Sequence, residues 1–577
     1  MASHPDYAPK EIPLDDPMNK HGSVEAQTYD LEDPSRRDTH DEAAGAAALH
    51  RSMKSRHIQM ISIGGVIELT LTQTDLKLDL RYWTLLGTAQ SLANGGPLGL
   101  LMGFLVMGTV VWNVMASLGE MVAHLPIAGG HVTLAKRFVD SSLSLTMGYN
   151  YFYNWAIVLP AEISASAILV NYWTKSVNNA VWITIFLIIV ALINLGGGRF
   201  YAEFEFWFAS IKVVTIVGLI ILGIILDAGG GPDHDAIGFR YWRNPGPFVQ
   251  HLGIEGSLGR FLGFWSVLIQ AAFSYIGTEI TAITAGEAKN PKKSLPSAIK
   301  GVAVRICVFY ILGTLIIGLL VPSNEPRLNL HSHDAASSPF VIAIEKSGIH
   351  SLPSIINAAL LSSAWSAASS DMYTSSRALY GLALAGNAPA VFKRTTSWGL
   401  PWVCLIVSFI FGLLAFMSVG SDGAGQAFEW LSNMSSVTGI LTWVGILITY
   451  LRFDAGVKAQ NIDREQFPYK SYLRTGGAIY GLVMCCLILL FNSYSVFIHG
   501  HWDTATFITG YLPIVVAIAM YFISKYMTKR QGGRSTILGV HEMDFYTDAR
   551  DEARDGCDDE DLSDEKKTFS QKFKEWL

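Results

Sequence analysis

The sequence predicts an all-α polytopic membrane protein, and two observations lead to this fold class. Of its 577 residues, 50% are hydrophobic and 16% are charged, with a mean hydropathy of +0.32, whereas soluble domains carry about 25% charged residues. Long apolar runs also recur along the chain, each close to the roughly 20 residues that a helix needs to cross a bilayer. Because lipid offers the backbone no water to bond, we expect these runs to be helical.

The predicted spans follow one another from residue 98 to residue 526. They are Leu98–Leu118, Leu143–Trp173, Val181–Leu195, Phe206–Leu226, Phe261–Ala285, Val302–Val321, Leu352–Ala385, Trp402–Val419, Phe428–Leu451, Gly476–Phe491 and Thr506–Tyr526. A further, damaged span near Ile58 precedes them, which gives about 12 spans. An even number places both ends of the chain on the same side of the membrane.

Basic loop residues predict which side that is, because cytosolic loops of membrane proteins are enriched in Lys and Arg. Three loops on the side of the two tails hold Lys289, Lys292, Lys293 and Lys300; Lys393 and Arg394; and Arg452, Lys458, Arg464, Lys470 and Arg474. The opposite loops carry fewer basic residues, and acidic residues accompany them. We therefore expect both tails to be cytosolic.

The two ends of the chain are polar. Residues 1–56 are rich in Asp, Glu and His and have no signal-peptide core, so we expect a disordered cytosolic N-terminal tail. Residues 528–577 are expected to form an acidic cytosolic C-terminal tail, and residues 57–527 the membrane domain. Five cysteines are too few for a disulfide framework. Because no metal-ligand spacing, phosphate loop or nucleophile elbow is present, we predict neither an enzyme nor a metal or cofactor site.

The stretch Ala271–Pro291, AAFSYIGTEITAITAGEAKNP, differs from an ordinary membrane helix. It contains Gly277 and places Glu279 where lipid depth is expected. Interrupted helices survive at that depth only around a protected cavity, and a carboxylate there is functional by default. Secondary transporters use such half-helices to bind small charged substrates, so the stretch predicts a transporter.

Four stretches of the chain carry a recognisable pattern. They are Phe273–Lys300, Ser117–Asp140, Gly148–Ala165 and Ser376–Phe392. The pattern resembles fungal amino-acid permeases, the yeast amino acid transporter family of the amino acid–polyamine–organocation superfamily, from about Lys54 to Lys529. Within that family, Val321–Leu330 and Ala336–Leu361 are most similar to the dicarboxylic amino-acid permeases.

The resemblance implies a leucine-transporter-like fold, with two inverted five-helix repeats and two further helices. Repeat one would cover about 57–227, repeat two about 261–452, and the extra spans about 475–527. It also implies a proton-coupled amino-acid importer that works by alternating access in the plasma membrane. Its partners would be an amino acid, a proton and the lipid bilayer, with no nucleic acid, and a ubiquitin-ligase adaptor could bind the tails.

The resemblance places the substrate at breaks in the first and sixth helices, whose amides would bind its carboxylate and whose carbonyls would bind its ammonium. The substrate-binding residues expected on this basis are Ser62, Gly64, Gly65, Phe273, Ser274, Tyr275, Ile276, Gly277, Thr278, Ser369, Asp371 and Asn433. Phe273 or Tyr275 would serve as a gate. A glycine-kinked packing helix is the alternative for the sixth span, and an interhelical hydrogen bond is the alternative for Asn433. Asp371 argues against an acidic substrate unless it is protonated or faces away.

Three ionisable residues inside spans are expected to take part in proton coupling, namely Glu162, Lys212 and Glu279. Proton-coupled relatives use a lysine at the position of Lys212 in place of a bound sodium ion, and its ammonium would bridge the first and eighth helices. The alternatives are a snorkelling Lys212 and carboxylates that only join helix segments.

One part of the chain departs from the family pattern. Ser62–Ile67 is followed by ELTLTQTDLKLDLRYWTLL (Glu68–Leu86), and the pattern resumes at Gly87. The expected glycine break is missing, and five charged residues stand in its place, each costing roughly 2.5–3.5 kcal/mol at the centre of a span. Either the stretch translates an intron edge or misplaced splice junction, which we favour, or the first helix is remodelled and the carrier is poor or inactive.

Two other functions compete with the importer. A permease-like amino-acid sensor would bind the substrate and signal without transport, but such sensors usually carry a longer cytosolic extension than the tails of this chain, which have about 56 and 50 residues. A nonfunctional product of the altered first helix would show reduced membrane delivery.

Overall fold

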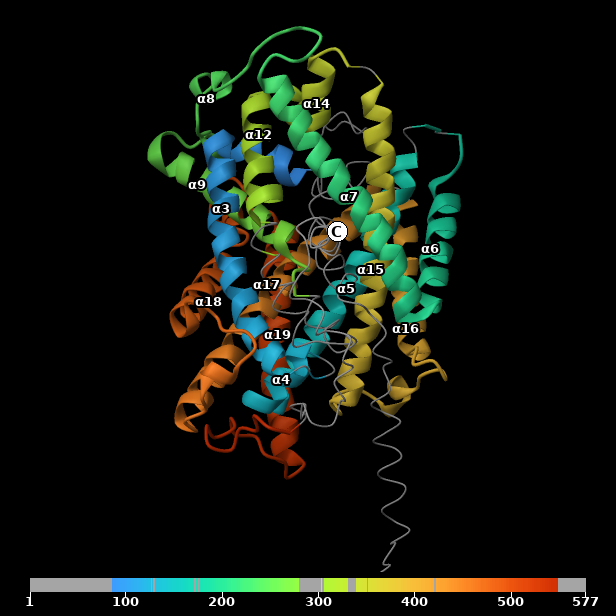
Figure 1. Cartoon of the computed structure of the whole chain (residues 1–577), viewed down its shortest axis with the longest axis vertical. Helices are drawn as coiled ribbons and strands as arrows, with labels where there is room; N and C mark the ends of the chain where they lie inside the picture. The colour runs from blue at the N-terminus through green and yellow to red at the C-terminus, as the bar shows by residue number, and fades with distance from the viewer. Residues whose placement is uncertain are drawn as a thin grey trace, which may run out of the picture. The chain divides into compact units, whose positions relative to one another are not determined.

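The computed structural model describes residues 86–125, 127, 130–170, 173–174, 176–279, 302, 306–329, 339–349, 351–419 and 422–547 (Figure 1). All of them belong to one compact unit, residues 49–577. Within the described residues the regular structure is helical, apart from an isolated bridge between Ala228 and Ala236. The fold class predicted from the sequence is therefore confirmed.

The helices follow the predicted spans closely. In chain order they are α3 (Leu86–His124), α4 (Gly130–Phe138), α5 (Ser141–Val170), α6 (Asn179–Leu195), α7 (Gly197–Asp227), α8 (Arg240–Arg243), η1 (His251–Gly253), α9 (Gly256–Tyr275), η3 (Ile306–Leu312), α12 (Gly313–Leu320), α13 (Pro326–Asn329), α14 (Pro339–Lys346), α15 (Leu352–Leu384), η5 (Ala390–Lys393), α16 (Trp402–Gly412), η6 (Leu413–Val419), α17 (Asp422–Ala459), η7 (Arg464–Gln466), α18 (Arg474–Leu490), η8 (Tyr494–Phe497) and α19 (Thr504–Arg530).

Length and apolar composition allow several of these helices to cross a membrane. Among the described residues, four stretches meet both conditions over at least 18 residues: Ser91–His124, Phe200–Asp227, Met434–Ala459 and Thr504–Arg530. Shorter apolar helices cover Asn179–Leu195, Ile306–Leu320, Trp402–Met417 and Arg474–Leu490. Helices α5 and α15 carry two of the remaining apolar runs, and α9 carries the described part of the third. The chain is therefore a multi-pass membrane protein.

Helix α3 consists of two segments joined at Gly96 and Pro97. Gly96 has φ 74° and ψ 173°, so the helix bends there. A Cβ at Gly96 would lie 2.7 Å from the carbonyl oxygen of Pro247, so the close approach of that loop requires glycine. The short first segment packs on α9, where Asn94 donates to Ser266 across 3.0 Å.

Two long helix pairs organise the core. Helix α15 packs along α5, and α3 packs along α9, as Figure 1 shows for the yellow and teal helices and for the blue and green ones. Helix α5 also contacts α17 through a polar seam, because Asn150 donates to the Thr438 carbonyl oxygen at 2.7 Å. On the next turn of α5, Asn154 accepts from Ser435 at 2.7 Å. Such interhelical hydrogen bonds hold membrane helices together where lipid cannot bond polar groups.

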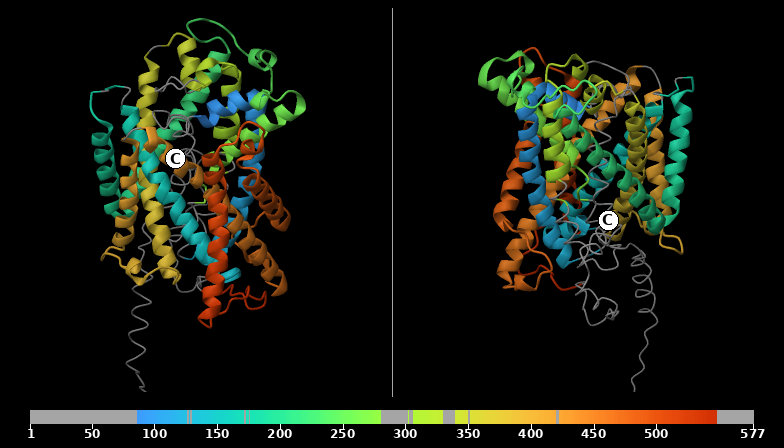
Figure 2. Two further views of the ribbon diagram at one scale, coloured as in Figure 1. Left: turned by 180° about the vertical axis from the view of Figure 1, so that it is seen from behind. Right: turned by 45° about the horizontal axis from the view of Figure 1, so that its top comes forward.

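The stretch that follows α19 packs against the helices rather than extending from them. Leu538 N–H donates to the carbonyl oxygen of Val139 at 2.9 Å, next to α4. Phe545 is fully buried, with its ring centroid 5.0 Å from that of Phe138 and 5.4 Å from that of Phe453 on α17. Residues 531–547, the first part of the predicted acidic tail, thus connect α4 with the end of α17 (Figure 2).

Several sequence-based expectations concern residues that the structure does not describe. The N-terminal tail, Ser62, Gly64, Gly65 and residues 68–85 of the departing stretch all lie outside the described residues. The same holds for residues 280–301, which include most of the lysine-rich loop after the sixth span.

Candidate functional site

Helix α9 ends in the middle of the predicted sixth span. Its last residue is Tyr275, and Ile276–Glu279 form turns. Gly277 has φ +100°, a conformation that residues with a Cβ rarely adopt. The helix therefore stops at the position where the sequence placed the break.

The break packs directly on α17. Ile276 lies against Gly439, where an added Cβ would come 2.4 Å from the Ile276 Cδ1 atom. One turn further along α17, Trp443 donates its indole N–H to Glu279 Oε2 at 3.2 Å. Gly439 and Trp443 share one face of α17 because they are four residues apart. This face therefore contacts both ends of the turn, Ile276 and Glu279.

Glu279 also bonds the backbone that the break leaves without helical partners. The Gly277 N–H donates to both Glu279 carboxylate oxygens, at 3.3 and 3.2 Å. Glu279 is fully buried. A buried carboxylate is stable only when it is hydrogen-bonded or protonated, and here it joins the turn to α17.

Residues before the turn are packed into the helix bundle. The Tyr275 ring lies 4.2 Å from that of Tyr310 in η3, and its hydroxyl donates to the Phe104 carbonyl oxygen of α3 at 3.0 Å. Tyr310 donates to the Ser274 carbonyl oxygen at 2.9 Å. The Tyr275 side chain is thus packed against α3 and η3. The side chain of Phe273, the other predicted gate, lies outside the described residues.

A second polar cluster lies between α7 and α15. The Lys212 ammonium donates to Ser366 Oγ at 2.8 Å, and Ser366 donates to Glu205 Oε2 at 2.7 Å. Lys212 Nζ lies 3.8 Å from Glu205 Oε1, and the two side chains are 0% and 1% exposed. Because α7 begins at Gly197, Lys212 lies about four turns inside the helix. Lys212 is therefore a buried residue in contact with the eighth predicted span, not a snorkelling one.

The predicted pocket serines on α15 face the neighbouring helices. Asn194 of α6 donates to Ser369 Oγ at 3.2 Å. Ser370 donates to Glu205 Oε2 at 3.3 Å and shares a 2.9 Å hydrogen bond with Tyr201 of α7. Asp371 follows them and is buried. These contacts fasten α15 to α6 and α7.

The other predicted residues are placed as follows. Thr278 lies in the turn, and its hydroxyl donates to the Tyr275 carbonyl oxygen at 3.3 Å. Glu162 lies on α5 and is buried. Asn433 is in α17, but its side chain lies outside the described residues. The structure thus brings some of the predicted residues into two described groups, Ser274–Glu279 at the turn on α17 and Lys212 with Ser370 between α7 and α15, and places Glu162 elsewhere on α5.

Glu205 and Trp443 belong to these groups but were not predicted from the sequence. Glu205 stands seven residues before Lys212, so two helical turns bring both to one face of α7. The predicted span began at Phe206 and excluded this acid by one residue, although an acid beside an apolar run is itself a signal. Trp443 sits inside an apolar run, and no feature of the sequence distinguishes it from a packing residue. In the described part of the chain, no group of three His, Cys, Asp or Glu residues could hold a metal ion.

Comparisons with known proteins agree with this picture. The amino acid permease family model matches residues 57–532. The dicarboxylic amino acid permease of Saccharomyces cerevisiae is 42% identical over 86% of this chain and 80% of its own length. The proline-specific permease of Emericella nidulans is 38% identical over 89% of this chain and 90% of its own length. The lysine-specific permease of Saccharomyces cerevisiae is 40% identical over 82% and 75%.

A solved structure shows the same fold. A variant of the Eremococcus coleocola manganese transporter matches with a TM-score of 0.50 over 82% of this chain and 95% of that chain. The sequence identity is 14%, so this likeness concerns the fold alone.

Proposed function

Because the chain belongs to the amino acid permease family, we propose that it is a proton-coupled amino-acid importer of the plasma membrane that works by alternating access. The family relatives are permeases and not enzymes, so membrane transport of amino acids is the activity from which the proposal starts.

The main support for substrate binding is that α9 ends at Tyr275 and is followed by a turn in which Gly277 has φ +100°. A helix that stops inside a span exposes carbonyl groups at its end and amides beyond it. The proposed site uses these groups at Ser274–Thr278 for the two charges of an amino acid, which would compete there with the Glu279 and Tyr310 side chains that bond the Gly277 N–H and the Ser274 carbonyl oxygen. Ser62, Gly64 and Gly65 would complete it from the first span, and Ser369, Asp371 and Asn433 are the proposed side-chain contacts.

The proposed proton-coupling group is Lys212, supported by its burial and by its bonds to Ser366 and Glu205. A buried ammonium must be paired with a hydrogen-bond acceptor or a negative charge, whereas the neutral amine that remains after loss of a proton does not need that partner. A change at Lys212 would therefore alter the contact between α7 and α15. Glu162 remains a second proposed member of the proton pathway.

Glu279 has contacts that favour a joining role within the proposed mechanism. Its carboxylate accepts from the Gly277 N–H and from Trp443. It would hold the turn to α17 while the site changes access, and protonation would weaken both bonds. This role connects the sixth and tenth predicted spans.

The proposed orientation places both tails in the cytosol. In that arrangement α4, the end of α17 and residues 531–547 lie on the cytosolic side, where a ubiquitin-ligase adaptor could reach the tails. The support for this orientation is the concentration of basic residues in the connecting loops.

Radiolabelled uptake in a permease-deficient yeast tests the proposal. The panel contains proline, lysine and a dicarboxylic amino acid, which are the substrates in the relatives' names, together with neutral and aromatic amino acids. We expect accumulation that rises with external acidity and is abolished by a protonophore. Surface delivery without accumulation of any amino acid by either of the two versions of the chain described below would contradict the importer, and a transcriptional response in those cells would favour a sensor.

The test uses two versions of the chain, because residues 68–86 depart from the family pattern. One version keeps residues 68–86 unchanged, and the other replaces them with the glycine break of the relatives. Transcript sequencing decides which version the cell makes. If the transcript encodes 68–86, we expect little uptake by the unchanged version and uptake by the repaired one.

A further inference from the structure

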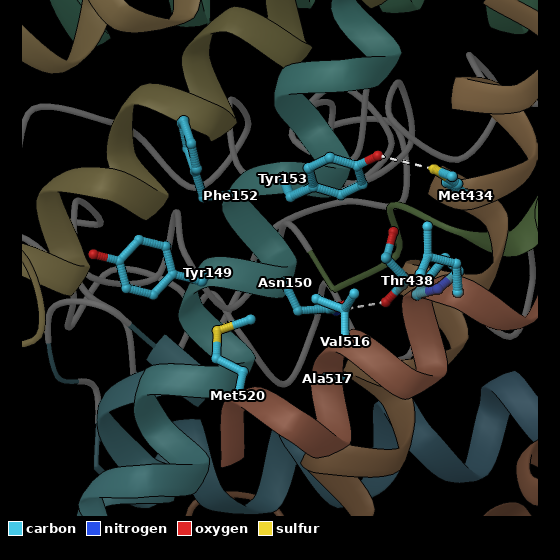
Figure 3. Close-up of a pocket in the computed structure, with 11 residues that line it drawn as sticks. Tyr149, Asn150, Phe152, Tyr153, Met434, Thr438, Val516, Ala517 and Met520 are labelled. Atoms are coloured by element: carbon cyan, nitrogen blue, oxygen red, sulfur yellow. Dashed lines mark hydrogen bonds between the residues drawn. The ribbon is translucent and has the colours of Figure 1, made fainter. Parts of the chain in front are cut away.

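A cavity lies between α5, α17 and α19 (Figure 3). Its volume is about 360 Å³. Tyr149 and Tyr153 line it from α5, Met434 from α17, and Pro513, Val516 and Met520 from α19. The walls are almost wholly apolar, so a ligand would have to be apolar as well.

The cavity lies near mid-depth of the helices that form it. Tyr153 is 12 residues from Ser141, where α5 begins, and Val516 is 12 residues from Thr504, where α19 begins. At a rise of 1.5 Å per residue, each is about 18 Å from that end of its helix. This depth corresponds to the hydrocarbon core of a bilayer, which is about 30 Å thick.

One side of the cavity opens toward the bilayer. Val515 and Phe522 on α19 are 60% and 63% exposed, so this helix lies at the periphery and presents apolar side chains outward. Val516 lines the cavity and is itself 47% exposed. The left view in Figure 2 shows α19, in red, beside α5. The mouth of the cavity therefore faces lipid.

The polar groups near the cavity are already engaged. The Asn150 amide donates to the Thr438 carbonyl oxygen and to Thr442 Oγ1. The Tyr153 hydroxyl donates to the Met434 sulfur at 3.3 Å. A zwitterionic amino acid would lose its hydration here without gaining hydrogen bonds, so the cavity is distinct from the proposed substrate site.

We propose that this cavity binds one acyl chain of a membrane lipid, which enters sideways between α5 and α19. A phospholipid headgroup stays at the interface, and its chain reaches mid-depth without a polar group. A flexible chain also adapts to the walls of three helices. Filling the space restores the close packing that protein interiors have, and the lipid then becomes part of the contact between α19 and the rest of the bundle.

Photo-crosslinking in lipid nanodiscs tests the proposal. One phosphatidylcholine carries a diazirine at the middle of its acyl chain, and a second carries it beside the glycerol. We expect the mid-chain probe to label the Tyr149–Tyr153 and Leu512–Met520 stretches, and unlabelled lipid to compete. Equal labelling of these stretches by the glycerol-proximal probe would overturn the proposal.

Two tryptophan variants form a matched pair. Ala517→Trp fills the cavity, because Ala517 lines it. If the indole displaces as few as two methylene groups of the bound acyl chain, binding weakens enough to lower labelling about tenfold. Val515→Trp places the same side chain at a neighbouring exposed position that does not line the cavity, and its labelling should equal that of the parent. Unchanged labelling in Ala517→Trp contradicts the proposal.

Two further measurements keep the result interpretable. Labelling of Val483, an exposed residue of α18, should stay constant in every variant and reports an intact lipid-facing surface. If Ala517→Trp fails to fold, Val516→Phe narrows the same cavity. A sterol probe that labels the cavity and displaces the acyl-chain probe would overturn the acyl-chain assignment.

Discussion

Glu205 and Lys212 form a buried ion pair within α7, with Lys212 Nζ 3.8 Å from Glu205 Oε1. Ser366 of α15 bridges the two, accepting from the ammonium and donating to the carboxylate. Both charged residues lie on α7, whereas the serine that bridges them lies on α15. A change in either charge therefore acts on the contact between α7 and α15.

Removing the ammonium should destabilise the protein and stop uptake. Lys212→Met leaves Glu205 buried without its cation, which costs about 3–5 kcal/mol. The double variant Glu205→Gln with Lys212→Met removes both charges and should regain most of that stability. We expect it to remain inactive, as measured by thermal denaturation and by uptake. Uptake with the parent's pH dependence in the double variant would refute the role of Lys212.

A surface lysine provides the control for this experiment. Lys470 pairs with Glu465, whose side chain is 80% exposed. Lys470→Met should change stability by less than about 1 kcal/mol, because exposed ion pairs contribute little. Uptake should not change.

Gly277→Ala should impair transport through the backbone. The φ of +100° strains any residue with a Cβ, at a cost of about 1–3 kcal/mol. The turn would shift and displace the groups proposed to bind the substrate, so we expect uptake to fall sharply. Gly218→Ala on α7 is the matched control, because nothing lies within 4 Å of the added Cβ. Equal uptake in the two variants would show that the Gly277 conformation is dispensable.

Trp443→Phe should weaken the attachment of the turn to α17. The substitution keeps an aromatic ring and removes the N–H that bonds Glu279 at 3.2 Å. A hydrogen bond to a charged group contributes about 1.5–3 kcal/mol. We expect a lower melting temperature and reduced uptake. Adding Glu279→Gln should then cost less than it does in the parent, because the two residues share one bond; additive costs would contradict their coupling.

Phe545→Ala should detach the segment that follows α19. Its ring is fully buried against Phe138 and Phe453, and truncating a buried Phe costs about 3–5 kcal/mol. Limited proteolysis should then cleave residues 531–547 faster. The adjacent Tyr546 is 70% exposed, so Tyr546→Ala is the control and should leave the cleavage rate unchanged. Equal protection in both variants would mean that the packing of Phe545 does not hold the segment.

Asp503 should make the stability of α19 depend on pH. Hydrogen bonds from the Thr506 side chain and backbone lower the pKa of this N-cap carboxyl below its ordinary value. Because the folded pKa is lowered, the stabilisation is present above the unfolded pKa of about 3.9 and is lost as pH falls through the folded value. Asp503→Ala should cost about 1 kcal/mol at neutral pH. Asp503→Asn keeps the acceptor, so thermal denaturation between pH 7 and acid should show a smaller pH effect.

The apolar spans could be predicted because lipid imposes a local rule. A run near 20 residues must form a helix whatever its neighbours are, and α6, α16, α18 and α19 begin within two residues of the predicted runs. The end of α9 was also predictable, since Gly277 inside an apolar run needs a structural reason. Lys212 and Glu279 stood out for the same reason, because charge inside a span is expensive.

Partners across helices could not be predicted in this way. Trp443 bonds Glu279 from 164 positions away, and Ser366 bonds Lys212 from 154 positions away. Spacing along one helix identifies which residues share a face, but not which helix that face meets. The sequence also did not indicate which helices Ser369 and Ser370 contact. The structure shows that they bond residues of α6 and α7.

By itself, the sequence determined the membrane environment, the helical spans, the family resemblance and the position where the sixth span breaks. Each of these follows from residues close together in the chain, because the bilayer penalises unpaired backbone and charge locally. The tertiary structure alone decided that Glu205 neutralises Lys212, that Glu279 is held by α17, that residues 531–547 are packed, and where the apolar cavity lies. These depend on contacts between helices distant in sequence, whose free energy is set by shape and burial after the helices have assembled.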